Sequence, residues 1–405
     1  CRVRNEGNET RESIKERMCA PGAKPEAVAA SAGQGAKASR GTGDQFNKNG
    51  VLRNNADWRC ILWIAKYFVL SALAWAYDDV IAASLPLSVA TFVVLSYYSF
   101  AGATIVHNTM HCRCFNNRDL EHVWHQLLSL TYGHPVSTFV PGHNLSHHRY
   151  TQTRMDPMRT SKLRYKWNVM NGIMFQPTVA RDVFKMDMRY LSLKGLQGEG
   201  FYRKSCQEWL VMGVTQIGML VLNWRKFLLY VWLPHFFAQW GIVSMNMLQH
   251  DGCDVNVDQD SSVEVKNYNG ARNFVGPVVN FLTFNNGYHT IHHMHPTMHW
   301  SRLAEEHTRQ VQPHVHPNLD QQCMARYIYK SFVSPGLRVD YLGDPVVFPE
   351  DEDVADEDWT IHHADDGMKL ADYDVDLTPM GILKALPMLP FKLLCPTYSP
   401  VNKVD

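Results

Sequence analysis

The sequence predicts an all-α integral membrane protein in which four transmembrane helices form two hairpins. Two pairs of long apolar segments lie far apart in the chain of 405 residues. Histidine clusters begin where these segments end, and basic residues are concentrated on one side of the predicted membrane. Together these observations predict one membrane-embedded body, although a chain of this length could also form two soluble domains.

The first pair of apolar segments predicts an N-terminal helical hairpin. Residues 60–77 contain a single charge, Lys66, and residues 80–106 contain none. Because a bilayer core of about 30 Å needs about 20 apolar residues per helix, the second segment spans easily. The first segment spans if Lys66 reaches the interface or faces protein.

The second pair, residues 206–223 and 227–249, predicts another hairpin. Only Trp224, Arg225 and Lys226 separate its two segments, which fits a tight turn. The alternative is that all four segments are buried helices of a soluble protein. Aromatic residues at the segment ends favour the membrane instead, because such residues are enriched at membrane interfaces.

The distribution of basic residues predicts the orientation. Residues 1–56 carry ten Lys or Arg and residues 107–205 carry fourteen, whereas the connection around Asp78 carries none. Because basic loops stay on the cytosolic side, we expect both termini and all histidine clusters on that side. Over the whole chain, 39 basic residues balance 39 acidic residues, so we expect no nucleic-acid partner.

The composition divides the chain into three parts. Residues 1–56 are polar and of low complexity, so we expect a tail that does not fold alone. Residues 57–320 form the predicted membrane domain. Residues 321–405 form a C-terminal extension with seven acidic residues between Glu350 and Asp358, which we interpret as a tail or a docking surface.

Three histidine clusters are the main chemical signal in the sequence. Their members are spaced three or four residues apart, which places imidazoles on one helical face. One more histidine ends the fourth predicted span, and an even number of crossings brings it to the same membrane side as the first cluster. Nine imidazoles are too many for one ion and suit two. They are His107, His111, His143, His147, His148, His250, His289, His292 and His293.

Imidazole binds zinc, copper, nickel or iron, so the ligand type alone does not identify the metal. The zinc protease signature H-E-x-x-H requires a glutamate, but Asn108 follows His107. Structural zinc normally takes four ligands, often including cysteine. Both zinc interpretations are therefore disfavoured, as is a solvated histidine-rich surface.

The motifs H-x-x-x-H, H-x-x-x-H-H and H-x-x-H-H, in this order around two hairpins, resemble the membrane fatty acid desaturase and hydroxylase superfamily over about residues 57–320. The resemblance implies a helical cap on the cytosolic side that holds a non-haem di-iron centre. It also implies that dioxygen is the co-substrate and that a narrow tunnel takes an acyl chain. It implies iron ligation by the eight histidines of the clusters and, by position, by His250. Asn246 would hold a water near one iron, and we expect Asp251 to orient the His250 imidazole.

The function that this resemblance implies is a fatty acyl desaturase of lipid metabolism or fatty acid biosynthesis. A di-iron lipid hydroxylase and a desaturase-fold accessory subunit of a larger membrane complex remain as alternatives. The haem motif H-P-G-G does not occur, so we expect an external electron carrier, a b-type cytochrome or ferredoxin, with its reductase. The expected location is the endoplasmic reticulum by default, with the mitochondrial inner membrane and the plastid as further options.

Several other charged and histidine residues have less specific interpretations. Arg149, Arg154 and Arg159 could bind a carboxylate, a phosphate or coenzyme A, but such residues at a membrane edge more often face anionic lipid. For His235 and His299 we expect packing and hydrogen bonding rather than metal ligation.

Overall fold

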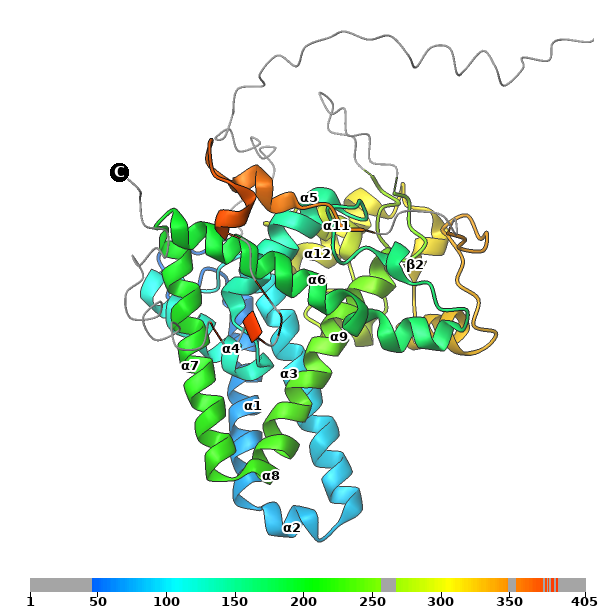
Figure 1. The fold of residues 1–405 in the computed structure, drawn as a ribbon. Coiled ribbons are helices and arrows are strands. Elements are labelled where there is room, and N and C mark those ends of the chain that lie inside the picture. The colour runs from blue at the N-terminus through cyan, green and yellow to red at the C-terminus, as the bar shows by residue number, and fades with distance from the viewer. Residues whose placement is uncertain are drawn as a thin grey trace, which may run out of the picture. The chain divides into compact units, whose positions relative to one another are not determined.

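The computed structural model describes residues 46–255, 267–348 and 355–373, together with positions 376, 378, 380, 381 and 384. These residues are mostly helical (Figure 1). Among them, two short strands, β1 (Asn273–Phe274) and β2 (Asp320–Gln321), pair in parallel. The prediction of a mostly helical chain is confirmed.

The first hairpin consists of α1 (Trp58–Ala76), the short α2 (Asp78–Ala82) and α3 (Leu85–His111). Its second long helix therefore begins at Leu85 rather than at residue 80. Pro86 lies in the first turn of α3. Its missing N–H costs no hydrogen bond there, because N–H groups in the first turn have no partner within the helix. The preceding residues form α2 as a separate helix at the turn of the hairpin.

The second hairpin consists of α7 (Gly200–Leu222), α8 (Trp224–Phe227), the π-helical turn η6 (Leu228–Trp232) and α9 (Leu233–His250). The side chain of Asn223 accepts a hydrogen bond from the backbone N–H of Lys226 and so caps α8. In Figure 1, α7 and α9 extend to the same end of the molecule as α1 and α3.

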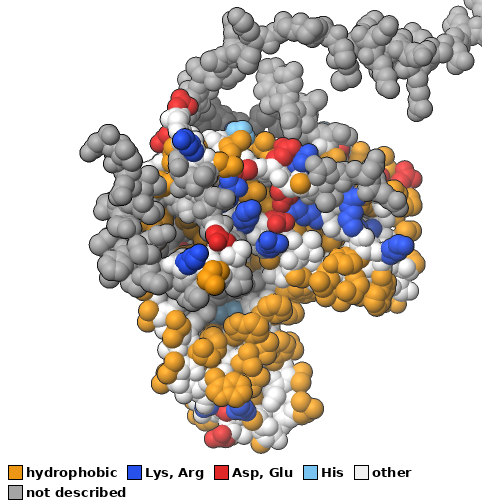
Figure 2. All heavy atoms as spheres, in the orientation of Figure 1, with side chains coloured by type: hydrophobic (Ala, Val, Ile, Leu, Met, Phe, Trp, Pro, Cys, Tyr) orange, Lys and Arg blue, Asp and Glu red, His pale blue; other side chains and the backbone are white. Residues whose placement is uncertain are grey.

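Three segments of the described chain are long and apolar enough to cross a membrane: Asn55–Ala76, Leu85–His111 and Trp224–His250. They are consistent with an integral membrane protein. Helix α7 is not among them; its first half carries Arg203, Lys204 and Glu208. The fourth crossing remains a prediction. Apolar side chains cover much of the surface toward the end where α2 and α8 lie, whereas charged side chains gather on the opposite part (Figure 2).

The cap is built from short helices and one long helix, α6 (Asn168–Leu196). The first histidine cluster lies at the end of α3, and the second lies between α3 and α6 in the chain. The third lies on a short helix after α9. The remaining elements are η2 (Asn55–Asp57), α4 (Arg118–Tyr132), η3 (Val136–Thr138), η4 (Val140–His147), α5 (His148–Tyr150), η5 (Thr160–Lys162), α10 (Pro277–Leu282), α11 (His289–Met294), η7 (Trp300–Arg302), α12 (Leu303–Glu306), η8 (His307–Val311), η9 (Pro317–Leu319), α13 (Met324–Ile328), η10 (Tyr329–Val333), η11 (Trp359–His363) and η12 (Leu370–Tyr373).

The main core lies where the cap meets the first hairpin. Residues at the cap end of α3, including Ile105 and Val106, pack with Leu128 of α4 and Ile291 of α11. All four side chains are at most 1% exposed. This packing fixes the end of α3, which carries the first histidine cluster, against the short helix that carries the third.

The folded body is larger than the predicted domain 57–320. Leu52, which we assigned to the N-terminal tail, is buried and forms a β-bridge with Phe115. In the C-terminal extension, Arg338 is buried and Trp359 is fully buried. The rest of the predicted tail, residues 1–45, and residues 349–354 of the acidic segment lie outside the described residues.

Candidate metal centre

The nine predicted histidines converge in two groups at the junction of the cap and the helical hairpins. Within each group, one possible ligand atom per residue lies within 4.8 Å of those of all other members. The larger group contains at least one histidine from each of the three sequence motifs. The smaller group includes the histidine that ends α9. The five-histidine group is His107, His111, His143, His148 and His292, and the four-histidine group is His147, His250, His289 and His293.

The π-helical geometry of η4 decides how the second motif is divided. In a π-helix, residues five positions apart are neighbours, in contrast to the four positions of an α-helix. Accordingly, Nε2 of His143 lies 3.1 Å from Nε2 of His148, and both belong to the five-histidine group. His147 faces the other group. The α-helical spacing assumed for the sequence would instead pair His143 with His147.

Distances between imidazole nitrogens fit shared ion sites. In the five-histidine group, Nε2 of His148 lies 3.1 Å from Nε2 of both His143 and His292. One ring N–H cannot bridge two such neighbours at once. Two nitrogens that each bind one ion at about 2.1 Å, at a right angle, would be about 3.0 Å apart. The spacing is therefore the one expected of ligands around a common metal.

The four-histidine group shows the same spacing. Nε2 of His289 lies 3.0 Å from Nε2 of His250 and 3.1 Å from Nε2 of His293. Here too a single nitrogen approaches two others. Both groups therefore fit a bound ion by the same geometric test.

Burial keeps the cap histidines in the form that binds metals. The pKa values of His143, His148 and His292 lie well below the usual imidazole value, first because burial disfavours the charged ring and then because neighbouring imidazoles repel its charge. The same causes lower the pKa values of His289 and His293. A neutral imidazole has the free lone pair that a metal requires.

A buried carboxylate orients His147. Nδ1 of His147 donates to Oδ2 of Asp156 over 2.9 Å, and both side chains are fully buried. Nε2 of His147 is buried and has no hydrogen-bond partner among the described residues, so its lone pair is available to a metal. Asp156 was not predicted from the sequence. Its only signal was an acidic residue nine positions after His147, which cannot be separated from other loop carboxylates by spacing alone.

The carboxylate of Asp156 is itself fixed by its loop. Backbone N–H groups of Gln152 and Met158 donate to its two oxygens over 3.0 and 2.9 Å. Burial alone would raise the pKa of Asp156, but the nearby His147 and these hydrogen bonds outweigh burial and lower it. Asp156 is thus an ionised, positioned acceptor for the His147 ring.

His250 joins the four-histidine group as predicted by its position, but its expected orienting residue is wrong. Its Nδ1 donates to the backbone carbonyl of Gly270 over 3.1 Å. The carboxylate of Asp251 instead accepts from Nε of Arg338 over 2.8 Å. The physical reason is that α9 ends at His250 and Asp251 has an extended backbone, so the two side chains face different surroundings.

Asn246, one turn before His250 on α9, faces a cavity beside the two groups. Its Nδ2 donates to the carbonyl of Met158 over 3.3 Å, and its Oδ1 has no hydrogen-bond partner among the described residues. A buried amide oxygen of this kind can accept from a water. The predicted role in holding a water near one metal stays a prediction.

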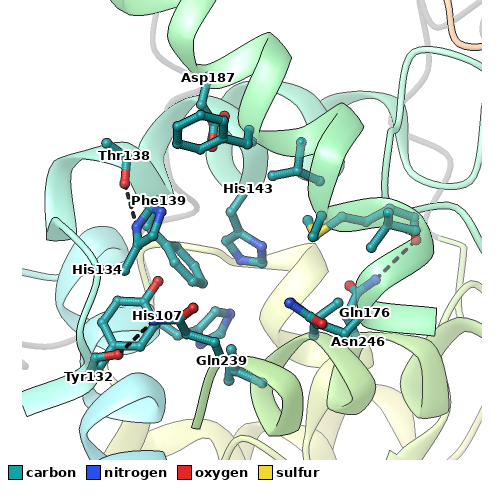
Figure 3. A pocket seen from close by; sticks show the side chains of 18 of the residues that line it. His107, Tyr132, His134, Thr138, Phe139, His143, Gln176, Asp187, Gln239 and Asn246 are labelled. Carbon is teal, nitrogen blue, oxygen red and sulfur yellow. Dashed lines mark hydrogen bonds between the residues drawn. The ribbon is translucent and has the colours of Figure 1, made fainter. Parts of the chain in front are cut away.

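The cavity has a volume of about 470 Å³ and lies between η4, α4, α6 and α9 (Figure 3). Most of its wall is apolar, including Val179 and Val183 of α6 and Ile242 of α9. His107 and His143 of the five-histidine group and His289 of the four-histidine group also line it. A ligand in this cavity would therefore lie against both groups.

His235 and His299 lie outside both groups, in agreement with the expectation of packing and hydrogen bonding. Nε2 of His235 lies 2.7 Å from the hydroxyl of Tyr67, and Nε2 of His299 lies 3.1 Å from Oδ1 of Asp57. Gly133 accommodates His235, because a Cβ atom there would lie 2.4 Å from its Nδ1. These histidines join helices to each other.

Comparison with known proteins identifies the family. A family model described as fatty acid desaturase matches residues 82–322, which is more than half of the chain. The chain belongs to the fatty acid desaturase family. All nine histidines of the two groups fall inside the matched region. The resemblance drawn from the histidine motifs is thereby confirmed.

Two curated relatives of this fatty acid desaturase family member are alkane 1-monooxygenases. The protein from Ectopseudomonas oleovorans is 25% identical over 52% of this chain and 51% of its own length. The protein from Pseudomonas putida is 25% identical over 50% of this chain and 49% of its own length. The chain thus spans about half the length of these relatives. No solved structure matches it.

Proposed function

We propose that this member of the fatty acid desaturase family is a membrane oxidase that uses dioxygen and two iron ions to oxidise a C–H bond of a lipid alkyl chain. One observation carries the proposal: histidines of both groups line the same largely apolar cavity. A chain bound there would present methylene groups directly to the proposed metal site. The apolar wall would exclude water from it.

The donor set supports iron. Nitrogen ligands in two adjacent groups, with no cysteine in either, do not resemble structural zinc. Bound iron would supply the oxidising power that an unactivated C–H bond requires. The chain's own residues would hold the ions and orient one ligand through Asp156. They would also shape the cavity that positions the substrate.

Two reactions fit the site equally. Hydroxylation converts a C–H group to C–OH and uses one O₂, two electrons and two protons, releasing one water. Desaturation removes two hydrogens from adjacent carbons with the same inputs and releases two waters. From the histidine motifs we expected desaturation, whereas the names of the two curated relatives favour hydroxylation. In either case, we propose that the electrons come from an external carrier, a b-type cytochrome or a ferredoxin, with its reductase.

The experiment is a product analysis with isotopic oxygen. Membranes containing the chain, a reductase and a small electron carrier are incubated with alkyl and acyl lipids under ¹⁸O₂, and the products are analysed by mass spectrometry. Hydroxylation leaves ¹⁸O in the lipid, whereas desaturation leaves a double bond without ¹⁸O. The His148→Ala variant is the matched control and should give neither product.

An accessory subunit of a larger membrane complex is the competing function. It predicts no oxygen-dependent product from any lipid tested, even when the purified chain contains iron and the carrier is reduced. That result would overturn the proposal. The arrangement of all nine histidines in two groups that each fit an ion favours an active enzyme, because a purely structural role does not require this geometry.

A further inference from the structure

A buried carboxyl group lies on the otherwise largely apolar wall of the cavity. Asp187 of α6 is 4% exposed and lines the cavity together with Val183 and Phe184 of the same helix. Figure 3 shows Asp187 and His143 on the wall of this one cavity. The carboxyl group is therefore placed where a substrate of the proposed oxidase would bind.

Asp187 lacks the partners that a buried carboxyl group normally has. Its Oδ1 has no hydrogen-bond partner among the described residues, and no ion pair joins it to any of them. Among the described residues, the backbone N–H of Gly142 favours its charged form. Burial outweighs this contact and raises the pKa of Asp187 well above its usual value. A neutral carboxyl group also carries an O–H that requires an acceptor.

The approach of Asp187 to η4 is close. A Cβ atom at Gly142 would lie 2.9 Å from Oδ1 of Asp187. Gly142 directly precedes His143, so a group bound to Asp187 would lie near the beginning of the second histidine motif. An unpaired buried polar group costs about 1–3 kcal/mol, which a ligand can recover by pairing with it.

We propose that Asp187 binds a polar oxygen of the substrate, a hydroxyl or a carbonyl group, while the alkyl chain occupies the apolar part of the cavity. The inference rests on the proposed function and narrows its substrate class to lipids with an oxygen function. A neutral carboxyl group both donates and accepts, so it matches either oxygen group. A plain alkane leaves the carboxyl group unpaired and binds less well.

The matched variants are Asp187→Asn and Asp187→Leu. Asparagine keeps a donor and an acceptor in nearly the same volume, whereas leucine keeps the branched shape, with larger methyl groups, and removes both. Hexadecane, hexadecanol and methyl palmitate are compared as ligands of the iron-free protein in detergent by equilibrium binding. They are then compared as substrates of the iron-loaded protein with its carrier. The alcohol and the ester distinguish a hydroxyl from a carbonyl as the preferred group.

The wild-type protein should prefer at least one oxygenated lipid over hexadecane. In Asp187→Leu this preference should fall by about 10- to 100-fold, and in Asp187→Asn most of it should remain. If Asp187 only supports η4 through Gly142, the leucine variant will weaken all three ligands by the same factor. An unchanged or uniform effect therefore overturns the inference.

The binding measurement separates this inference from the proposed function. If the wild-type protein oxidises none of the lipids, the proposed function fails, but the binding preference of the iron-free protein still tests Asp187. If oxidation occurs and the preference does not depend on Asp187, only the inference fails. Thermal unfolding and iron content of both variants show whether the fold and the metal site are retained.

Discussion

Replacing Trp359 with alanine should release the C-terminal segment 355–363 from the cap. Trp359 is fully buried and packs against Tyr190 of α6, with ring centroids 5.6 Å apart. Beside it, Asp356 pairs with Arg159 and with Lys162, the latter over 2.7 Å. The segment thus covers the loop that follows the second histidine motif and contains Asp156.

The expected magnitude follows from the burial of the indole ring. Truncating a buried tryptophan to alanine costs about 3–5 kcal/mol, which shifts the docking equilibrium of the segment by about 100-fold or more. Arg159 is 3% exposed in the docked state, so trypsin cannot reach it there. Because cleavage follows the population of the open state, the Trp359→Ala variant should be cut after Arg159 much faster than the wild type.

The assay is limited trypsin digestion in detergent, with cleavage sites identified by mass spectrometry. The control is Ile361→Ala, since Ile361 lies in the same segment but is 49% exposed and contributes little packing. The control should be cut at the wild-type rate. Equal protection of Arg159 in the wild type and in Trp359→Ala would refute the reasoning that the buried tryptophan holds the segment in place.

The remaining predictions concern the metal site. His250→Ala should lose one of two metal ions while His299→Ala keeps both, because only His250 belongs to a metal group; elemental analysis checks this, and the reverse pattern would contradict it. Asp156→Asn should weaken metal binding by about 10- to 100-fold in a chelator competition, since it removes the charged acceptor of His147, and an unchanged affinity would disprove that role. The metal-free protein should unfold at a lower temperature as the pH falls from about 7.5 to about 5.5. His143, His289 and His293 have lowered pKa values in the folded protein, so the unfolded chain takes up more protons in this range; equal unfolding temperatures would show that these rings are not held neutral by burial.

Much of the fold could be predicted because long apolar segments obey one strong constraint, the thickness of a bilayer. The boundaries were harder. Pro86 falls inside a predicted span of uncharged residues, and only the structure shows that it lies in the first turn of α3. The polar beginning of α7 could not be assigned from composition, because Glu208 is an acidic residue and yet is fully buried. Its carboxylate accepts hydrogen bonds from the backbone N–H and the hydroxyl of Ser137.

The sequence was sufficient to predict which histidines form the site, but not how they divide into two groups. Helical spacing brought the nine histidines together, while the division of His143, His147 and His148 between two groups depends on the π-helical turn η4. Contacts that depend on long-range folding were missed. The pairing of Asp251 with Arg338 joins residues 87 positions apart, so neighbourhood in sequence pointed to the wrong acceptor for His250.

The central claim is that two adjacent histidine groups each bind one iron ion. The most direct measurement is the iron and zinc content of the purified wild-type chain, combined with that of His111→Ala and His293→Ala, one variant from each group. We expect two iron ions per wild-type chain, little zinc, and the loss of one iron in each single variant. One metal ion per wild-type chain, or zinc in place of iron, would contradict it.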